Sequence, residues 1–278
     1  MSRQIKNIIA ITVFLICIGL INVAGQNIEI EIRGMNAFTF ILIIAVLLQI
    51  IFFIPSFLLK TEKYYDLVGS LTYITTISLA YLSVENKTMI DSIIYFYVMV
   101  WALRLGIYLF RRVRNDGKDV RFEKAKKHFF WFLQYWMGQA LWVSLTACAA
   151  IIAILSPEED TLPVLAIVGM ALWLSGFAIE SISDYQKRVF RKENNPSEAF
   201  IHTGLWARSR HPNYFGEITL WTGIAVIALN TLTGIEYITL ISPVFVYILL
   251  TRMSGVNLLE RIADERYGHL EEYQSYKR

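Results

Sequence analysis

The chain contains eight apolar segments, each long enough to cross a lipid bilayer as an α-helix, and this restricts it to a helical membrane fold. About 20 apolar residues span the ~30 Å hydrocarbon core, where backbone polar groups must be satisfied inside the protein. The composition agrees, because 55% of the 278 residues are hydrophobic and only 18% are charged. The expected helices are 5–25, 35–59, 66–84, 92–110, 129–155, 162–182, 214–232 and 236–253.

We therefore predict an all-α, polytopic integral membrane helical bundle of about eight transmembrane helices, with seven possible, forming a single membrane domain over residues 1–278. Basic residues near helix ends favour the cytoplasmic side of the membrane. A cytoplasmic N-terminus places 23 of the 26 Lys and Arg residues on that side. Both termini are therefore predicted to be cytoplasmic. The net charge of +3 follows from this topology and gives no support to nucleic-acid binding.

Polar residues within the predicted helices gather in the half of the bundle that faces the cytosol. Such groups face a bundle interior or a wet cavity, because lipid cannot satisfy them. Glu217 lies about one turn inside a helix, so it either has a function or only reaches to the interface. We expect a polar pocket that opens to the cytosol, formed by Asp66, Tyr73, Arg104, Tyr108, Gln139, Glu180, Asp184, Asn213, Glu217 and Arg252.

The cysteines and histidines do not indicate a metal or redox site. Cys17 and Cys148 lie in apolar segments without a C-x-x-C spacing, which is typical of packing residues. The four histidines form no H-x-x-x-H or H-E-x-x-H pair, so we expect no metal ligands.

Four charged residues after the sixth apolar segment share one face of a helix. Glu180, Asp184, Arg188 and Arg191 are spaced for this, and two interpretations are open. The first is an amphipathic helix end with ion pairs worth a few tenths of a kcal/mol. The second is a nucleotide site, in which arginines bind phosphate and carboxylates bind ribose hydroxyls.

A second basic group precedes the seventh helix. Arg208 and Arg210 lie just before Pro212, which suits the first position of a helix. Free N–H groups and the positive end of the helix dipole there favour an anion. His211 either joins that site or only makes a hydrogen bond at the helix start. Because no G-x-G-x-x-G or P-loop spacing occurs, a nucleotide would be held by membrane helices and loops.

Several stretches resemble a bacterial domain-of-unknown-function membrane family related to the C-terminal domain of steroid 5-alpha-reductases. The resemblance covers roughly residues 60–278. The wider superfamily includes NADPH-dependent sterol and steroid reductases, and isoprenylcysteine carboxyl methyltransferases that use S-adenosylmethionine. The stretches are Asp66–Tyr73 (DLVGSLTY), Trp101–Arg111 (WALRLGIYLFR), Gln139–Val143 (QALWV), Gly204–Glu217 (GLWARSRHPNYFGE), Leu258–Gly268 (LLERIADERYG) and Tyr273–Lys277 (YQSYK).

The resemblance implies a helical bundle in the bacterial inner membrane, with a cofactor cavity that faces the cytosol. It also implies that Tyr108 polarises a substrate carbonyl, with support from Asp66 or Arg104. The chain departs from the reductases at three points, one of which is the short apolar tail expected after the Tyr-Lys motif. Their Gln-Glu pair in an early helix has no clear counterpart, Asp66 being the nearest substitute, and Glu180 stands where an Asn is expected. By position, the residues that resemble those holding NADPH are Asp184, Arg188, Arg191, Asn213, Glu217 and Arg252.

We therefore expect a membrane-embedded, NADPH-dependent reductase of a carbon–carbon double bond in a steroid-, sterol- or isoprenoid-like substrate taken from the bilayer. One alternative is a membrane methyltransferase that uses S-adenosylmethionine, against which the many basic residues count. Another is a non-catalytic lipid-binding membrane protein. The expected catalytic residues are Tyr108, Asp66 and Arg104. The expected cofactor-binding residues are Glu180, Asp184, Arg188, Arg191, Arg208, Arg210, His211, Asn213, Tyr214, Glu217 and Arg252.

Overall fold

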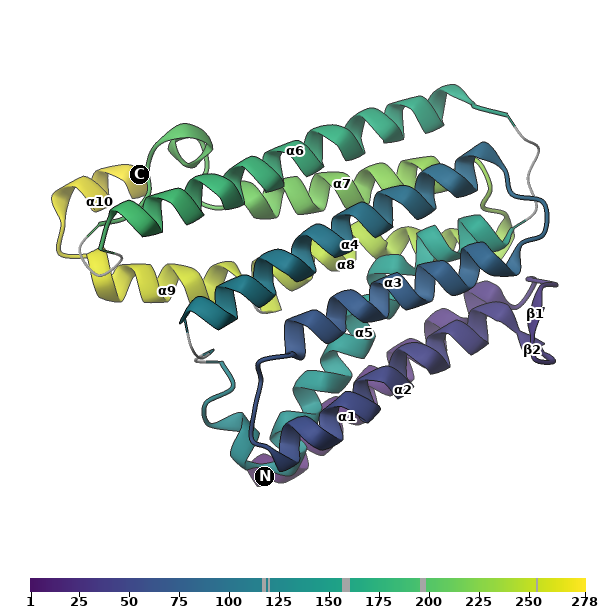
Figure 1. The fold of residues 1–278 in the computed structure, drawn as a ribbon, viewed down its shortest axis with the longest axis horizontal. Helices are drawn as coiled ribbons and strands as arrows, with labels where there is room; N and C mark the ends of the chain where they lie inside the picture. Colours follow the sequence, from purple (N-terminus) through teal and green to yellow (C-terminus); the bar gives the residue numbers. More distant parts are fainter. Residues whose placement is uncertain (117–118, 120, 157–160, 196–198, 254) are drawn as a thin grey trace. The chain divides into compact units, whose positions relative to one another are not determined.

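The computed structural model describes residues 1–116, 119, 121–156, 161–195, 199–253 and 255–278, and these residues are mostly helical (Figure 1). They form two compact units. Unit 1 comprises Met1–Ala166 and Ile227–Ile241, and unit 2 comprises Ile167–Val226 and Ser242–Arg278. The single membrane domain expected for the whole chain stays a prediction.

Unit 1 is built around one central helix, α5. In the apolar stretch of α5, 83% of the residues are buried, whereas 22–39% are buried in the apolar stretches of the other candidate membrane spans. It packs against α1, α2, α3 and α4, and its bounds are those expected from the sequence. The helices of unit 1 are α1 (Arg3–Ile21), α2 (Ala37–Leu58), α3 (Tyr65–Ser83), α4 (Met89–Asp116) and α5 (Phe129–Leu155), with short 3-10 helices at Asn22–Gly25, Ala125–Lys127 and Gly234–Leu240.

A two-stranded hairpin connects the first two helices of unit 1. Its strands are β1 (Glu31–Ile32) and β2 (Met35–Asn36), which pair antiparallel. The Asn36 amide donates to the carbonyls of Gly25 (2.9 Å) and Ile28 (2.8 Å), while its Oδ1 caps α2 by accepting from the Thr39 N–H (3.1 Å). Two-residue strands are too short to show an alternating pattern, so the sequence did not reveal this hairpin.

Unit 2 contains the remaining long helices and the C-terminal tail. Helix α6 has 30 residues and continues to Glu193, beyond the apolar segment that ends at 182, so Glu180, Asp184, Arg188 and Arg191 lie on one helix, as their spacing indicates. The elements of unit 2 are α6 (Val164–Glu193), a 3-10 helix at Gly204–Ala207, α7 (Pro212–Ala228), α8 (Ile241–Ile248), a π-helical turn at Leu249–Met253, α9 (Val256–Tyr267) and α10 (Glu271–Lys277). The first residues of α6 and α8 and the last residues of α7 are assigned to unit 1.

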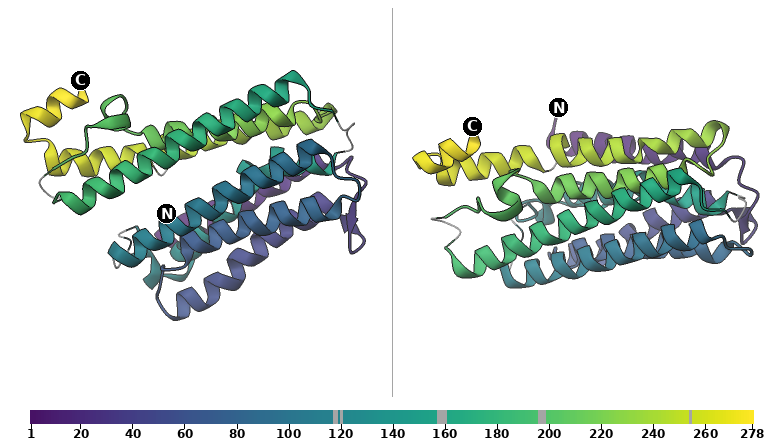
Figure 2. Two further views of the ribbon diagram at one scale, coloured as in Figure 1. Left: turned by 45° about the horizontal axis from the view of Figure 1, so that its top comes forward. Right: turned by 90° about the horizontal axis from the view of Figure 1, so that it is seen from above.

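Helices α6 and α7 run side by side and approach each other backbone to backbone (Figure 2). A Cβ atom on Gly216 would lie 2.6 Å from the Glu180 nitrogen and 2.7 Å from the Gly176 carbonyl oxygen. Small residues allow such close approach between membrane helices. The contact sets the first turns of α7 against the polar end of α6.

Of the helical segments that the structure describes, six are long and apolar enough to cross a membrane. The chain is thus an all-α polytopic membrane protein. All eight expected segments are helical, but α3 and α7 are not among the six: α7 has 17 residues, and α3 contains many polar ones. The count of eight spans and the cytoplasmic termini stay predictions. The six are Arg3–Gly25, Ala37–Leu58, Met89–Val113, Phe129–Leu155, Val164–Glu193 and Gly234–Met253.

Candidate functional site

A cleft of about 170 Å³ lies within unit 2, between the end of α6, the segment 199–211 and the C-terminal helices α9 and α10. We call it the C-terminal cleft. Its described lining includes cationic, aromatic and aliphatic residues, with one acidic side chain, Glu260, next to His211. The cationic residues are Lys187, Arg191, Arg210 and Arg266, and the aromatic residues are Phe190, Phe200, Trp206, Tyr267, Tyr273 and Tyr276.

The aromatic wall of the cleft is centred on Phe200. Its ring centroid lies 5.7, 5.1 and 5.4 Å from those of Tyr267, Tyr273 and Tyr276. The hydroxyl of Tyr276 donates to the carbonyl of Trp206. These contacts hold α10 against the segment before α7, so the tail forms one wall of the cleft.

Polar contacts attach the other wall to α6. The indole N–H of Trp206 donates to the carbonyl of Ser183 at 3.1 Å, and Nζ of Lys187 lies 4.6 Å from the centre of the Trp206 ring. The side-chain oxygen of Gln186 accepts from the N–H of Leu205 at 3.1 Å. The ammonium of Lys187 is thus positioned by an aromatic face at the cleft.

Glu260 joins the two basic residues that precede α7. Its Oε1 lies 2.6 Å from Nε2 of His211, and its Oε2 accepts from Nη1 of Arg210. An ionised carboxylate only accepts hydrogen bonds, so His211 donates from Nε2. Burial lowers the pKa of His211, and this outweighs the hydrogen bond and charge of Glu260, which act to raise it. At pH 7 the ring is neutral, and Arg210 balances the charge of Glu260.

Asp264 fixes the far end of the tail. It pairs with Nζ of Lys277 at 2.6 and 2.7 Å and accepts from the hydroxyl of Tyr273 at 3.2 Å. The hydrogen bond from Lys277 lowers the pKa of Asp264. Burial, followed by the hydrogen bond to Asp264, raises the pKa of Tyr273 to about 12, so this phenol stays protonated.

Three of the predicted cofactor residues line the C-terminal cleft: Arg191, Arg210 and His211. Tyr214 lies beside them, because its ring stacks on that of His211 with centroids 5.6 Å apart. The residues directly before α7, where the sequence predicts an anion site, therefore line a cleft with several cationic side chains.

The predicted acidic residues lie instead where α6 meets α7. Glu180, Asp184 and Glu217 are all buried there. The side-chain amide of Asn213 lies 3.4 Å from Oδ1 of Asp184, which links two of the predicted cofactor residues. Burial of three carboxylates in one layer is costly in a membrane protein and favours a functional role.

The remaining predicted cofactor residues, Arg188, Arg208 and Arg252, are exposed, as are the cleft-lining Arg191 and Arg266. The described lining of the C-terminal cleft does not include Arg188, Arg208 or Arg252. The guanidinium of Arg188 lies 5.4 Å from the centre of the Tyr185 ring. Sharing a helical face with Glu180 and Asp184 therefore did not bury Arg188.

The three predicted catalytic residues belong to unit 1. Asp66, in the first turn of α3, pairs with Nη2 of Arg112 at 3.5 Å and with Nη2 of Arg121 at 3.6 Å. Arg104 and Tyr108 lie one turn apart on α4 and are partly buried. The structure thus gives Asp66 two arginine partners that the sequence did not predict.

Sequence reasoning did not assign a role to Glu260, Arg266, Tyr267, Tyr273 or Tyr276. They lie in the two C-terminal stretches that carry the family resemblance, Leu258–Gly268 and Tyr273–Lys277. The resemblance of these stretches was the feature of the sequence that could have indicated a role for them. Their position beside Arg210 became visible only because the tail folds back as α9 and α10.

The sequence matches the family described as protein of unknown function (DUF1295) over residues 52–278. The match begins inside α2 and covers every later element, including the C-terminal cleft. No curated protein and no solved structure matches the chain significantly. Because the matched residues make up more than half of its length, the chain belongs to the DUF1295 family.

Proposed function

We propose that this protein is a membrane-embedded reductase that uses NADPH to reduce a carbon–carbon double bond in a lipophilic substrate. One observation carries the proposal. Among the described residues that line the C-terminal cleft, four are cationic and one, Glu260, is a carboxylate, which leaves an excess of three positive charges. His211 adds none at pH 7, because burial keeps it neutral. Such an excess suits a ligand with several phosphate charges.

The side chains present fit a phosphorylated dinucleotide in chemistry. Arginine binds phosphate with two parallel hydrogen bonds, and Arg191, Arg210 and Arg266 offer three such groups. The first turn of α7, a 17-residue helix, directly follows Arg210 and His211 and presents N–H groups to an anion. Aromatic rings such as Phe200 provide stacking surfaces for a base. When bound, NADPH would supply hydride, and the protein would supply binding and electrostatics.

The class of reaction rests on the resemblance to steroid 5-alpha-reductases. Tyr108 is the proposed group that polarises a substrate carbonyl and supplies a proton, with Arg104 one turn away on the same helix. The substrate would be steroid-, sterol- or isoprenoid-like and would enter from the bilayer.

We also propose the topology that this activity requires. Helix α3 packs on α2, α4 and α5, and α7 packs on α6, so neighbouring helices shield the less apolar spans. Eight spans with both termini in the cytosol would put the cationic cleft on the cytosolic side of the bacterial inner membrane.

A methyltransferase that uses S-adenosylmethionine is the second candidate. The aromatic wall around Phe200 favours it, since tyrosine rings attract sulfonium-type cations. The cationic residues of the same cleft oppose it, because they would repel the sulfonium. We consider the charge excess the stronger effect.

Thermal unfolding of the purified protein in detergent separates these candidates. A ligand at a hundred times its Kd stabilises the folded state by about 2.7 kcal/mol. We expect NADPH to raise the midpoint by several degrees and S-adenosylmethionine to leave it unchanged. The reverse result would establish the methyltransferase. Stabilisation by neither compound would leave a non-catalytic lipid-binding protein.

A further inference from the structure

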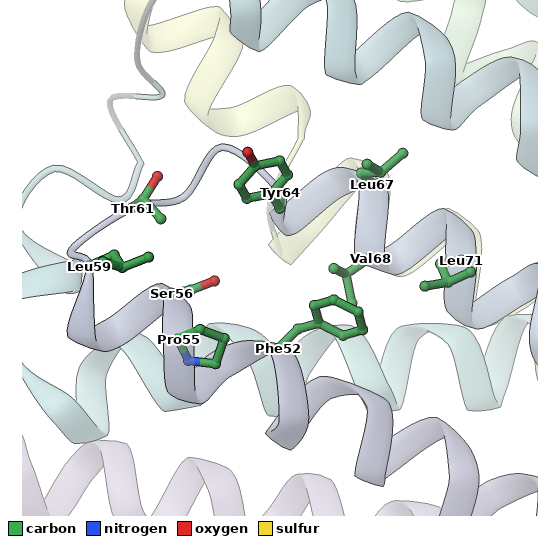
Figure 3. A pocket seen from close by; sticks show the side chains of 9 residues that line it. All are labelled: Phe52, Pro55, Ser56, Leu59, Thr61, Tyr64, Leu67, Val68 and Leu71. Atoms are coloured by element: carbon green, nitrogen blue, oxygen red, sulfur yellow. The ribbon is translucent and has the colours of Figure 1, made fainter.

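A separate groove lies in unit 1, where α2 ends and α3 begins (Figure 3). Its volume is about 320 Å³, at the lower end of the ~300–1,000 Å³ typical of ligand sites. Pro55 lines it from α2, Leu59 from the residue after α2, and Leu67, Val68 and Leu71 from α3. The groove and the C-terminal cleft share no lining residue.

The groove is apolar and open to its surroundings. Among the described residues that line it, only Ser56, Thr61 and Tyr64 have polar side chains. Leu59 is 75% exposed, and Leu71 is also exposed. Leu59 directly follows the candidate membrane span Ala37–Leu58, so the natural occupant of such a groove is a hydrocarbon chain.

Two lysines lie beside lining residues of the groove in the sequence. Lys60 and Lys63 are exposed and lie in the connection that contributes Leu59, Thr61 and Tyr64 to the lining. The one acidic residue of this connection, Glu62, is buried and pairs with Nζ of Lys126 at 2.5 Å. The exposed charges of this connection are therefore both positive.

The backbone of Lys60 adopts a conformation that is uncommon for a residue with a side chain. Its φ is +50°, in the left-handed region at the C-terminal end of α2, where glycine is the favoured residue. A lysine there costs conformational free energy that a glycine would avoid. Residues held in such conformations occur preferentially at functional sites.

We propose that this groove binds one acyl chain of an anionic phospholipid, whose phosphate pairs with Lys60 and Lys63. The lysines directly follow the candidate span Ala37–Leu58, which places them at headgroup level. A volume near 320 Å³ suits a single chain better than a whole lipid. The site is independent of the proposed NADPH site.

Photolabelling of the full chain in phosphatidylcholine vesicles tests this. One preparation contains a little phosphatidylglycerol with a diazirine in its acyl chain, and the other contains phosphatidylcholine with the same diazirine. We expect phosphatidylglycerol to label residues 52–71 roughly 30-fold more than phosphatidylcholine does, since two lysines near an anionic headgroup together contribute about 2 kcal/mol.

Variants separate the headgroup contact from the chain contact. Lys60→Gln with Lys63→Gln should reduce phosphatidylglycerol labelling to the phosphatidylcholine level. Leu71→Trp should fill the groove and reduce labelling by both lipids. Lys124→Gln with Lys127→Gln, an exposed pair in another loop, makes the same charge change and should have no effect. Unfolding midpoints equal to wild type confirm that each variant is folded.

Two results would overturn the proposal. They are equal labelling by the two lipids in wild type and labelling spread evenly over all helices.

Discussion

Oε1 of Glu260 on α9 lies 2.6 Å from Nε2 of His211, the residue that directly precedes α7. This bond, with that from Arg210 to the same carboxylate, connects α9 to the start of α7. The three side chains all line the C-terminal cleft.

The stability of the protein should fall as the pH decreases from 7.5 to 5.5. Burial lowers the pKa of His211 below its ordinary value of 6.5, so the unfolded chain binds a proton there before the folded chain does. Stability is therefore lost as the pH falls from 6.5 towards the folded-state pKa. Lys187 and Arg210 add to this effect, while Glu260 opposes it.

The measurement is the thermal unfolding midpoint in detergent at several pH values. His211→Gln keeps a donor for Glu260 but removes the titration, so its midpoint should change less between pH 7.5 and 5.5. If wild type and His211→Gln follow the same curve, the histidine does not contribute in this way.

Close packing of α6 on α7 should make Gly216 intolerant of any side chain. In Gly216→Ala the new methyl would meet backbone atoms of Glu180 and Gly176 at 2.6 and 2.7 Å, so the helices must separate. Overpacking of this kind costs about 1–3 kcal/mol. Gly19→Ala is the matched control, because nothing lies within 4 Å of a Cβ there. A wild-type unfolding midpoint for Gly216→Ala would contradict the packing.

Much of this fold was predictable because membrane helices are long, apolar and independent of distant contacts. The bounds of α5 at Phe129 and Leu155 follow directly from its apolar run. The apolar run of α6 ends at 182, and its polar continuation to Glu193 was indicated only by the helical spacing of charged residues such as Arg188 and Arg191. The hairpin ending at Asn36 was missed because two-residue strands carry no pattern.

The candidate site was predictable only in part. Arg210 and His211 were expected because they lie beside a helix start, and Arg191 because it shares a helical face with other charged residues. Glu260 and the tail tyrosines lie much further along the chain, and no periodicity or motif spacing indicates such a contact. Conversely, Arg188 has the spacing of a site residue, but the described lining of the cleft does not include it.

Tyr108→Phe should lower the turnover of the proposed reduction without weakening NADPH binding. A positioned proton donor typically contributes 10²–10⁴-fold to rate, so a loss of about that size is expected. Tyr95→Phe is the control on the same helix, where the ring stacks on Tyr81 at 4.3 Å. Oxidation of NADPH with an enone-containing lipid gives the turnover. Unchanged turnover in Tyr108→Phe would remove this residue from the mechanism.

The most direct test of the central claim is an equilibrium titration of the purified protein with NADPH. Arg266→Ala removes one cleft-lining charge. Arg261→Ala removes a charge from the same helix that is also exposed but is not in the described lining of the cleft, and Arg261 pairs only loosely with Glu265 at 3.9 Å. Losing a charge-assisted hydrogen bond costs about 1.5–3 kcal/mol. We predict saturable binding in wild type and Arg261→Ala, and binding at least about ten-fold weaker in Arg266→Ala. Equal affinity in all three proteins, or no saturable binding in wild type, would contradict the account.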